Sequence, residues 1–218
     1  MKTIKPDKQS GFTIIELSIS MAMLSVLMLI VIFSILNIIG VYNKGITLKR
    51  VNQSGRTIAA EIQSDLRSAV PSNIGIRGTD LAGTLVPTAL CTGKNSYIWN
   101  VWGENGVNTD IKFDSTNEPV TMVKTNDPGG EYCKVPFPLP EKNTSKVLLG
   151  DELAVRMPVE VAVGGEGKII QFKFTISTPD DNNEIIYDDT GRGSCGGGKE
   201  SEICALNTFV VTSYAKGI

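Results

Sequence analysis

The chain has 218 residues, of which 41% are hydrophobic and 20% charged, and its formal net charge is -2. This is the composition of an ordinary globular protein, and so small a charge provides no basic surface for nucleic acid. The sequence contains no histidine, so the commonest general base and the commonest metal ligand are both missing. We therefore expect a protein that is not an enzyme and that needs no cofactor.

Residues 1–11 form a short polar leader with three lysines and one aspartate. By the positive-inside rule this end stays in the cytoplasm and the C-terminal bulk of the chain crosses the membrane. The apolar run that follows continues to about Val41 and lacks the Ala-x-Ala cleavage site of an ordinary secretory signal. Because a spanning helix takes about 20 residues, we expect residues 12–42 to form a transmembrane helix that stays in the mature protein.

A single charged residue, Glu16, lies within residues 12–43. A carboxylate in hydrocarbon costs about 2.5–3.5 kcal/mol on insertion scales, so it calls for a partner or a function. The segment holds no second ionisable residue, and the partner is therefore expected from another molecule. The alternative is that Glu16 lies close enough to the helix end to reach the lipid headgroups.

The helical period persists beyond Tyr42. Apolar or small residues recur there at spacings of three or four, at Val51, Gly55, Ile58, Ile62, Leu66 and Ala69. Charged residues lie between them, which predicts that residues 43–70 continue the helix in amphipathic form. Pro71 disfavours helix in the residue before it and marks the end, while Gly40 and Gly45 are expected weak points.

From residue 71 to residue 218 the pattern changes to short β-type runs separated by turns. The predicted strands are Thr84–Leu90, Tyr97–Trp102, Asp110–Phe113, Val120–Lys124, Val147–Leu149, Leu153–Val163, Lys168–Thr178, Ile185–Tyr187 and Thr208–Tyr214. Several of these runs alternate well enough for half-buried antiparallel strands. The prediction is an α+β fold, in which the apolar stripe of residues 51–69 covers one face of an antiparallel sheet.

All four cysteines, Cys91, Cys133, Cys195 and Cys204, lie C-terminal to the apolar segment. An even number in an exported domain predicts two disulfides in an oxidising compartment. Four cysteines allow three pairings; a small ring closed by Cys195 and Cys204, with Cys91 bonded to Cys133, is preferred. Free or metal-bound thiols are the alternative, although no Cys-x2-Cys pair is present.

Three further patterns point to ligands only weakly. The oxygen-rich stretch that contains Asp180, Asp181, Asp188 and Asp189 could hold calcium, but its spacing does not match the EF-hand loop and a solvated turn is the simpler interpretation. The run Gly193–Glu200 lacks the final hydroxyl of a phosphate-binding loop. Tyr97, Trp99 and Trp102 alternate along one segment, either in the core or as an adhesive surface for carbohydrate.

The run from Gly11 and Phe12 through Glu16 to Leu17, followed by an apolar helix, resembles the class III signal of type IV pilins and pseudopilins. The resemblance covers residues 8 to about 40; residues 58–69 are similar, more weakly, to minor pilins of the PilW and PulJ kind. It implies a pilin-like fold, cleavage after Gly11 by a membrane prepilin peptidase and methylation of the new amine of Phe12. It also implies that Glu16 attracts the N-terminal amine of a neighbouring subunit during assembly.

The same resemblance implies partners and a location. The partners are other pilin subunits, the prepilin peptidase and a pilus assembly platform; the location is the bacterial cytoplasmic membrane, then an extracellular pilus or a periplasmic pseudopilus. No proline interrupts residues 12–70, which favours a minor pilin at a priming or tip position. The alternatives are a pseudopilin of a type II secretion or DNA-uptake system, and a membrane-anchored binding domain that never polymerises.

Overall fold

The structure is a computed structural model of the chain. It describes residues 13–81, 84–103, 106–107, 111–136, 138–150, 152–165, 169–178, 185–188, 193–196 and 204–215. The chain divides into two compact units, Met1–Tyr42 and Asn43–Ile218. One helix, α1 (Ile14–Ser68), contributes residues to both.

Two five-stranded sheets make up most of the second unit. The first has the order β1 (Gly75–Leu81), β2 (Thr84–Cys91), β3 (Asn95–Trp99), β6 (Met122–Asn126) and β7 (Lys146–Leu149). The second has the order β12 (Leu206–Tyr214), β9 (Ile169–Ser177), β8 (Ala154–Gly164), β4 (Val101–Gly103) and β5 (Gly106–Val107). The small elements are the hairpin of β10 (Ile185–Tyr187) and β11 (Gly193–Cys195) and the 3-10 turns η1 (Pro71–Asn73) and η2 (Glu131–Cys133).

The neighbouring strands pair antiparallel, except that β4 runs parallel to β8. A long helix packed on antiparallel sheets is the predicted α+β, pilin-like arrangement, which is thereby confirmed. The structure adds that the strands form two five-stranded sheets and a separate two-stranded hairpin, where the sequence indicated one sheet.

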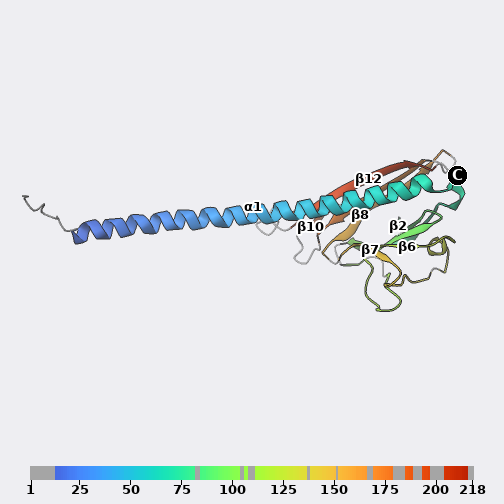
Figure 1. Cartoon of the computed structure of the whole chain (residues 1–218), viewed down its shortest axis with the longest axis horizontal. Coiled ribbons are helices and arrows are strands. Elements are labelled where there is room, and N and C mark those ends of the chain that lie inside the picture. Colours follow the sequence, from blue (N-terminus) through green and yellow to red (C-terminus); the bar gives the residue numbers. More distant parts are fainter. Residues whose placement is uncertain are drawn as a thin grey trace, which may run out of the picture. The chain divides into compact units, whose positions relative to one another are not determined.

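The second half of α1 packs on these sheets through the predicted stripe. Val51, Ile58, Ile62 and Leu66 are at most 1% exposed, and they join side chains of both sheets in one core cluster. In Figure 1 this part of the helix runs alongside β12, and Gln63 donates a hydrogen bond of 3.2 Å to the carbonyl of Thr212. The helix ends at Ser68, three residues before Pro71, as the restriction before proline predicts.

Gly55 is the point of closest approach between the helix and the second sheet. A Cβ atom at this position would lie 2.1 Å from two ring carbons of Phe209 on β12. The Phe209 ring stacks on Phe174 at 5.5 Å between centroids, and Phe174 stacks on Phe172 at 5.0 Å. Only glycine lets the helix backbone meet this row of aromatic rings.

The first sheet is covered on both of its faces. One face carries Leu90, Tyr97 and Trp99 into the main core, whereas Ala89, Ile98 and Val123 point into a second cluster with Ile111, Phe113 and Val120. Burial on both faces explains why β3 reads as an almost continuous buried run. Tyr97 and Trp99 are therefore core residues, with 0% exposure, and not part of an adhesive surface.

The predicted strand Tyr97–Trp102 is wrong in one respect, because the chain changes sheet in the middle of it. Asn100 separates β3 of the first sheet from β4 of the second. Its fully buried side chain accepts a hydrogen bond from the Ile111 amide at 2.9 Å and donates one to the Ile111 carbonyl at 2.7 Å. These bonds take the place of a strand partner at the corner.

The strand predictions differ from the structure elsewhere too. The described part of Asp110–Phe113 forms only an isolated bridge, between Lys112 and Pro119. Conversely, the structure has a strand at Gly75–Leu81 that the sequence does not predict, because its glycines and polar residues give no period-two alternation. It pairs with β2 from Gly75 opposite Cys91 to Leu81 opposite Thr84.

The cysteines form two disulfides, in the pairing preferred from the sequence. Cys91 is bonded to Cys133, across a sequence separation of 42, and ties the end of β2 to η2. Cys195 is bonded to Cys204 across a separation of 9, which joins the β10–β11 hairpin to the segment that leads into β12. Both bonds lie in the second unit.

Candidate functional site: the N-terminal segment of α1

The predicted processing residues lie only partly within the described chain. Gly11 and Phe12 are outside the described residues, whereas Glu16 lies in the first turn of α1 and is exposed. The calcium candidates Asp180, Asp181 and Asp189 also lie outside the described residues, and Asp188 is exposed. Among the residues that the structure describes, no group of three metal-binding side chains occurs.

Thr13 caps the N-terminus of α1. Its Oγ1 accepts a hydrogen bond from the Glu16 amide at 3.3 Å, and its carbonyl accepts the first helical bond from the Leu17 amide at 3.1 Å. Thr-x-x-Glu is the sequence of a capping box, a signal that places the start of the helix from local sequence alone. It places the Glu16 carboxylate where the free amides of the first turn favour negative charge.

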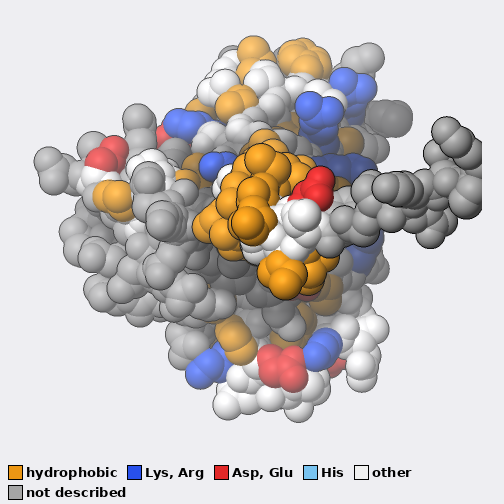
Figure 2. Space-filling view, turned by 90° about the vertical axis from the view of Figure 1, so that its left-hand side faces the viewer, with side chains coloured by type: hydrophobic (Ala, Val, Ile, Leu, Met, Phe, Trp, Pro, Cys, Tyr) orange, Lys and Arg blue, Asp and Glu red, His pale blue; other side chains and the backbone are white. Residues whose placement is uncertain are grey.

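From Ile14 to Tyr42 the helix exposes large apolar side chains on every face. Ile14 is 87% exposed and Val41 is 75% exposed, and this helix is long and apolar enough to cross a membrane. Figure 2, which views the N-terminal end of the helix, shows hydrophobic side chains gathered there around a small acidic area. Each such side chain gains about 1.5–3 kcal/mol when it is fully buried, so this surface is built to be covered by lipid or by other helices.

The serine hydroxyls within this segment are satisfied by the helix itself. Ser20, Ser25 and Ser34 each donate a hydrogen bond of 2.8 Å to the carbonyl four residues earlier. Hydrogen bonds of this kind let serine lie in hydrocarbon without an unpaired donor. Glu16 is the one charged side chain of residues 13–42, so its burial in an apolar medium would be the most costly there without a partner outside the helix.

A cluster of charged and polar side chains lies where α1 meets the first sheet. Asp65 accepts hydrogen bonds from the Tyr97 hydroxyl at 2.7 Å and from the Asn95 amide at 2.8 Å, and its carboxylate lies 2.8 Å from Lys124. Glu61 is paired with Lys124 at 3.3 Å and with Lys146 at 2.8 Å. The cluster fixes the rotation of the helix on the sheet.

The cluster changes the acidity of its members. Burial acts to raise the pKa of Asp65, but the hydrogen bonds from Lys124, Tyr97 and Asn95 outweigh it, and the pKa is lowered overall. The pKa of Glu61 is lowered in the same way, burial being outweighed by Lys146 and Lys124. Burial, and then the bond to Asp65, raises the pKa of Tyr97. These interactions hold α1 against the first sheet.

Comparison with known proteins identifies the N-terminal segment. Residues 6–36 match the family model described as the prokaryotic N-terminal methylation motif. The chain thus carries the class III signal of type IV pilins, across the junction between the basic leader and the apolar helix, which confirms this part of the resemblance; the likeness of residues 58–69 to minor pilins lies outside the match. No curated protein and no solved structure gives a match.

Proposed function

We propose that this protein is a minor pilin, which a prepilin peptidase processes and which then assembles into a type IV pilus. The observation that carries the proposal is the juxtaposition of the methylation motif with a helix surface that is apolar on every side and holds one acid, Glu16. The motif supports processing and assembly of the pilin or pseudopilin kind, and the apolar helix supports membrane anchoring. No catalytic role is proposed.

The assembly step follows from the chemistry of the N-terminus. Cleavage after Gly11 creates an amine on Phe12, and methylation of that amine leaves it positively charged. Opposite charges attract strongly in a bundle of apolar helices, because the dielectric constant there is low. A subunit that docks out of register leaves Glu16 unpaired, at a cost of several kcal/mol. The acid therefore sets the axial position of each subunit.

The size of the second unit and the absence of proline in α1 favour a minor subunit. Its two five-stranded sheets make a bulky head, which packs with least crowding at the tip of a filament. The similarity of residues 58–69 to minor pilins of the PilW and PulJ kind points the same way. A pseudopilus of a secretion or DNA-uptake system is the other assembly that this signal serves.

The intact mass of the protein purified from its native membrane tests the processing step. We expect a chain that begins at methylated Phe12, and in cells without the peptidase a chain that retains the leader. A full-length chain in normal cells would refute the proposal. Exposure of the assembled subunit on sheared surface filaments, compared with retention in the periplasm, distinguishes the pilus from the pseudopilus.

The role of Glu16 is tested separately from processing. Glu16→Gln keeps the shape of the side chain and removes its charge, so we expect normal cleavage and loss of the protein from filaments. Ser25→Ala is the matched control, since the Ser25 hydroxyl bonds only within the helix, to the Met21 carbonyl. Equal incorporation of the two variants would show that the charge does not guide docking.

A further inference from the structure

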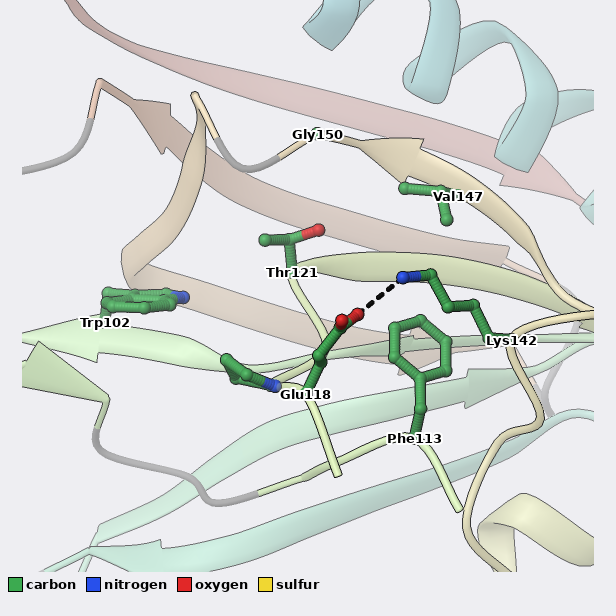
Figure 3. Close-up of a pocket in the computed structure, with 8 residues that line it drawn as sticks. Trp102, Phe113, Glu118, Thr121, Lys142, Val147 and Gly150 are labelled. Carbon is green, nitrogen blue, oxygen red and sulfur yellow. Dashed lines mark hydrogen bonds and ion pairs between the residues drawn. The ribbon is translucent and has the colours of Figure 1, made fainter. Parts of the chain in front are cut away.

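A pocket of about 460 Å³ opens on the β-rich unit, away from α1. Its lining comes from β4, the segment between β5 and β6, β7, and the segments that precede and follow β7. The lining residues are Trp102, Phe113, Glu118, Pro119, Thr121, Lys142, Val147 and Gly150. Figure 3 shows the Trp102 ring on one side of the pocket, with the Glu118–Lys142 ion pair and the Phe113 ring on the other. The volume is that of an ordinary small-molecule site.

Two aromatic rings form the walls of this pocket. Phe113 is 5% exposed and is held by the second core cluster, so its ring is fixed. Trp102 follows the sheet change at Asn100 and is only partly buried, unlike the other two aromatic residues of that segment. Flat apolar walls of this kind pack against a ligand that has an apolar face of its own.

The polar groups of the pocket differ in the hydrogen bonds that they can still make. The Trp102 indole nitrogen is buried, has no partner among the described residues, and lies on the pocket side of the ring in Figure 3. The hydrogen bond from Lys142 lowers the pKa of Glu118, which is therefore an ionised carboxylate that only accepts. The Thr121 hydroxyl donates to the Leu149 carbonyl, so its oxygen is left to accept.

A ligand for this site must both donate and accept hydrogen bonds. Trp102 and Lys142 can only donate, whereas Glu118 can only accept, and hydroxyl groups match all three. The charges of Glu118 and Lys142 cancel, so the pocket selects neither an anion nor a cation. We propose that this pocket binds a neutral saccharide, whose C–H face packs on the aromatic rings and whose hydroxyls bond to Glu118, Lys142 and the Trp102 indole.

The binding test uses the purified full chain in a detergent without a sugar headgroup, applied to an array of neutral and sialylated oligosaccharides. We expect binding to neutral glycans and no gain in affinity from an added sialic acid, since the charges of Glu118 and Lys142 cancel and give its carboxylate no net attraction. Titration of the best neutral glycan is then followed by tryptophan fluorescence. An array on which the protein binds no neutral glycan overturns the proposal.

Two variants assign the binding to this pocket. Glu118→Ala removes an exposed carboxylate and Trp102→Phe removes the indole donor, and we expect each to lower the affinity at least about tenfold. Glu131→Ala is the matched control, because Glu131 forms a similar exposed ion pair, with Lys134 at 2.8 Å, outside the pocket. If Trp102→Phe does not fold, Glu118→Ala alone decides, and unchanged affinity in it refutes the site.

This proposal does not depend on the one for α1. Saccharide binding is measured on the purified chain, before any processing or assembly. Failure of the array therefore leaves the assembly function untouched, and failure of processing leaves the binding result standing.

Discussion

Replacement of Gly55 by alanine tests the packing of α1 on the second sheet. In an isolated helix the change is favourable by about 1 kcal/mol, because glycine is a poor helix former. Here the new Cβ atom would lie 2.1 Å from the Cε2 and Cζ atoms of Phe209, whereas carbon atoms in contact are about 3.5–4.0 Å apart. The ring must therefore retreat by more than about 1 Å.

The neighbours of Phe209 oppose that retreat. Its ring stacks on Phe174 at 5.5 Å, Phe174 on Phe172 at 5.0 Å, and Phe172 lies 5.3 Å from the fully buried Trp99. Overpacking of a well-packed core costs about 1–3 kcal/mol, and the large overlap places this change at the upper end. After the gain in helix propensity is subtracted, we expect Gly55→Ala to lower the free energy of unfolding by about 2 kcal/mol.

Urea unfolding of the full chain in detergent, followed by tryptophan fluorescence, measures this loss. Gly45→Ala is the matched control on the same helix, since nothing lies within 4 Å of a Cβ atom there, and its stability should be unchanged or higher. Phe209→Leu combined with Gly55→Ala should recover part of the loss, with a coupling of at least about 1 kcal/mol. If Gly55→Ala is as stable as Gly45→Ala, the argument from the close approach is wrong.

Three further predictions concern the second unit. Tyr97→Phe removes the hydrogen bond to Asp65 and should lower the free energy of unfolding by about 1.5–3 kcal/mol in urea titrations, with unchanged secondary structure by circular dichroism. The pKa values of Asp65 and Glu61 are lowered in the folded state, so the two carboxylates contribute to the stability of the fold. This stabilisation is complete above their unfolded-state pKa values of about 4, and it is lost as the pH falls through the lowered folded-state pKa values. Thermal unfolding at pH 5 and pH 3 should show this loss, and a variant with both acids replaced by their amides should show less of it. By the loop-entropy relation, loss of the Cys91–Cys133 disulfide should lower the free energy of unfolding by about 4 kcal/mol, and loss of the Cys195–Cys204 disulfide by about 3 kcal/mol. If urea unfolding shows equal losses, or a larger loss for the Cys195–Cys204 bond, the loop-entropy argument is contradicted.

The features that the sequence predicts correctly are those that depend on local order along the chain. The apolar run from Leu17 to Val41 predicts a helix, and the structure has there one that is long and apolar enough to cross a membrane. The stripe from Val51 to Ala69 is buried in the structure, because residues three or four apart share one helix face. Both signals repeat along a single element, and no distant residue is needed to read them.

The features that only the tertiary structure decides depend on distant residues. Trp99 and Trp102 look alike in the sequence, but the chain changes sheet at Asn100, so one ring enters the core and the other lines a pocket. Gly75–Leu81 becomes a strand through its pairing with β2. In the sequence Gly55 is one small residue of the apolar stripe, and its close approach to Phe209, more than 150 positions along the chain, is seen only in the structure. In each case the deciding contact joins residues that local periodicity cannot relate.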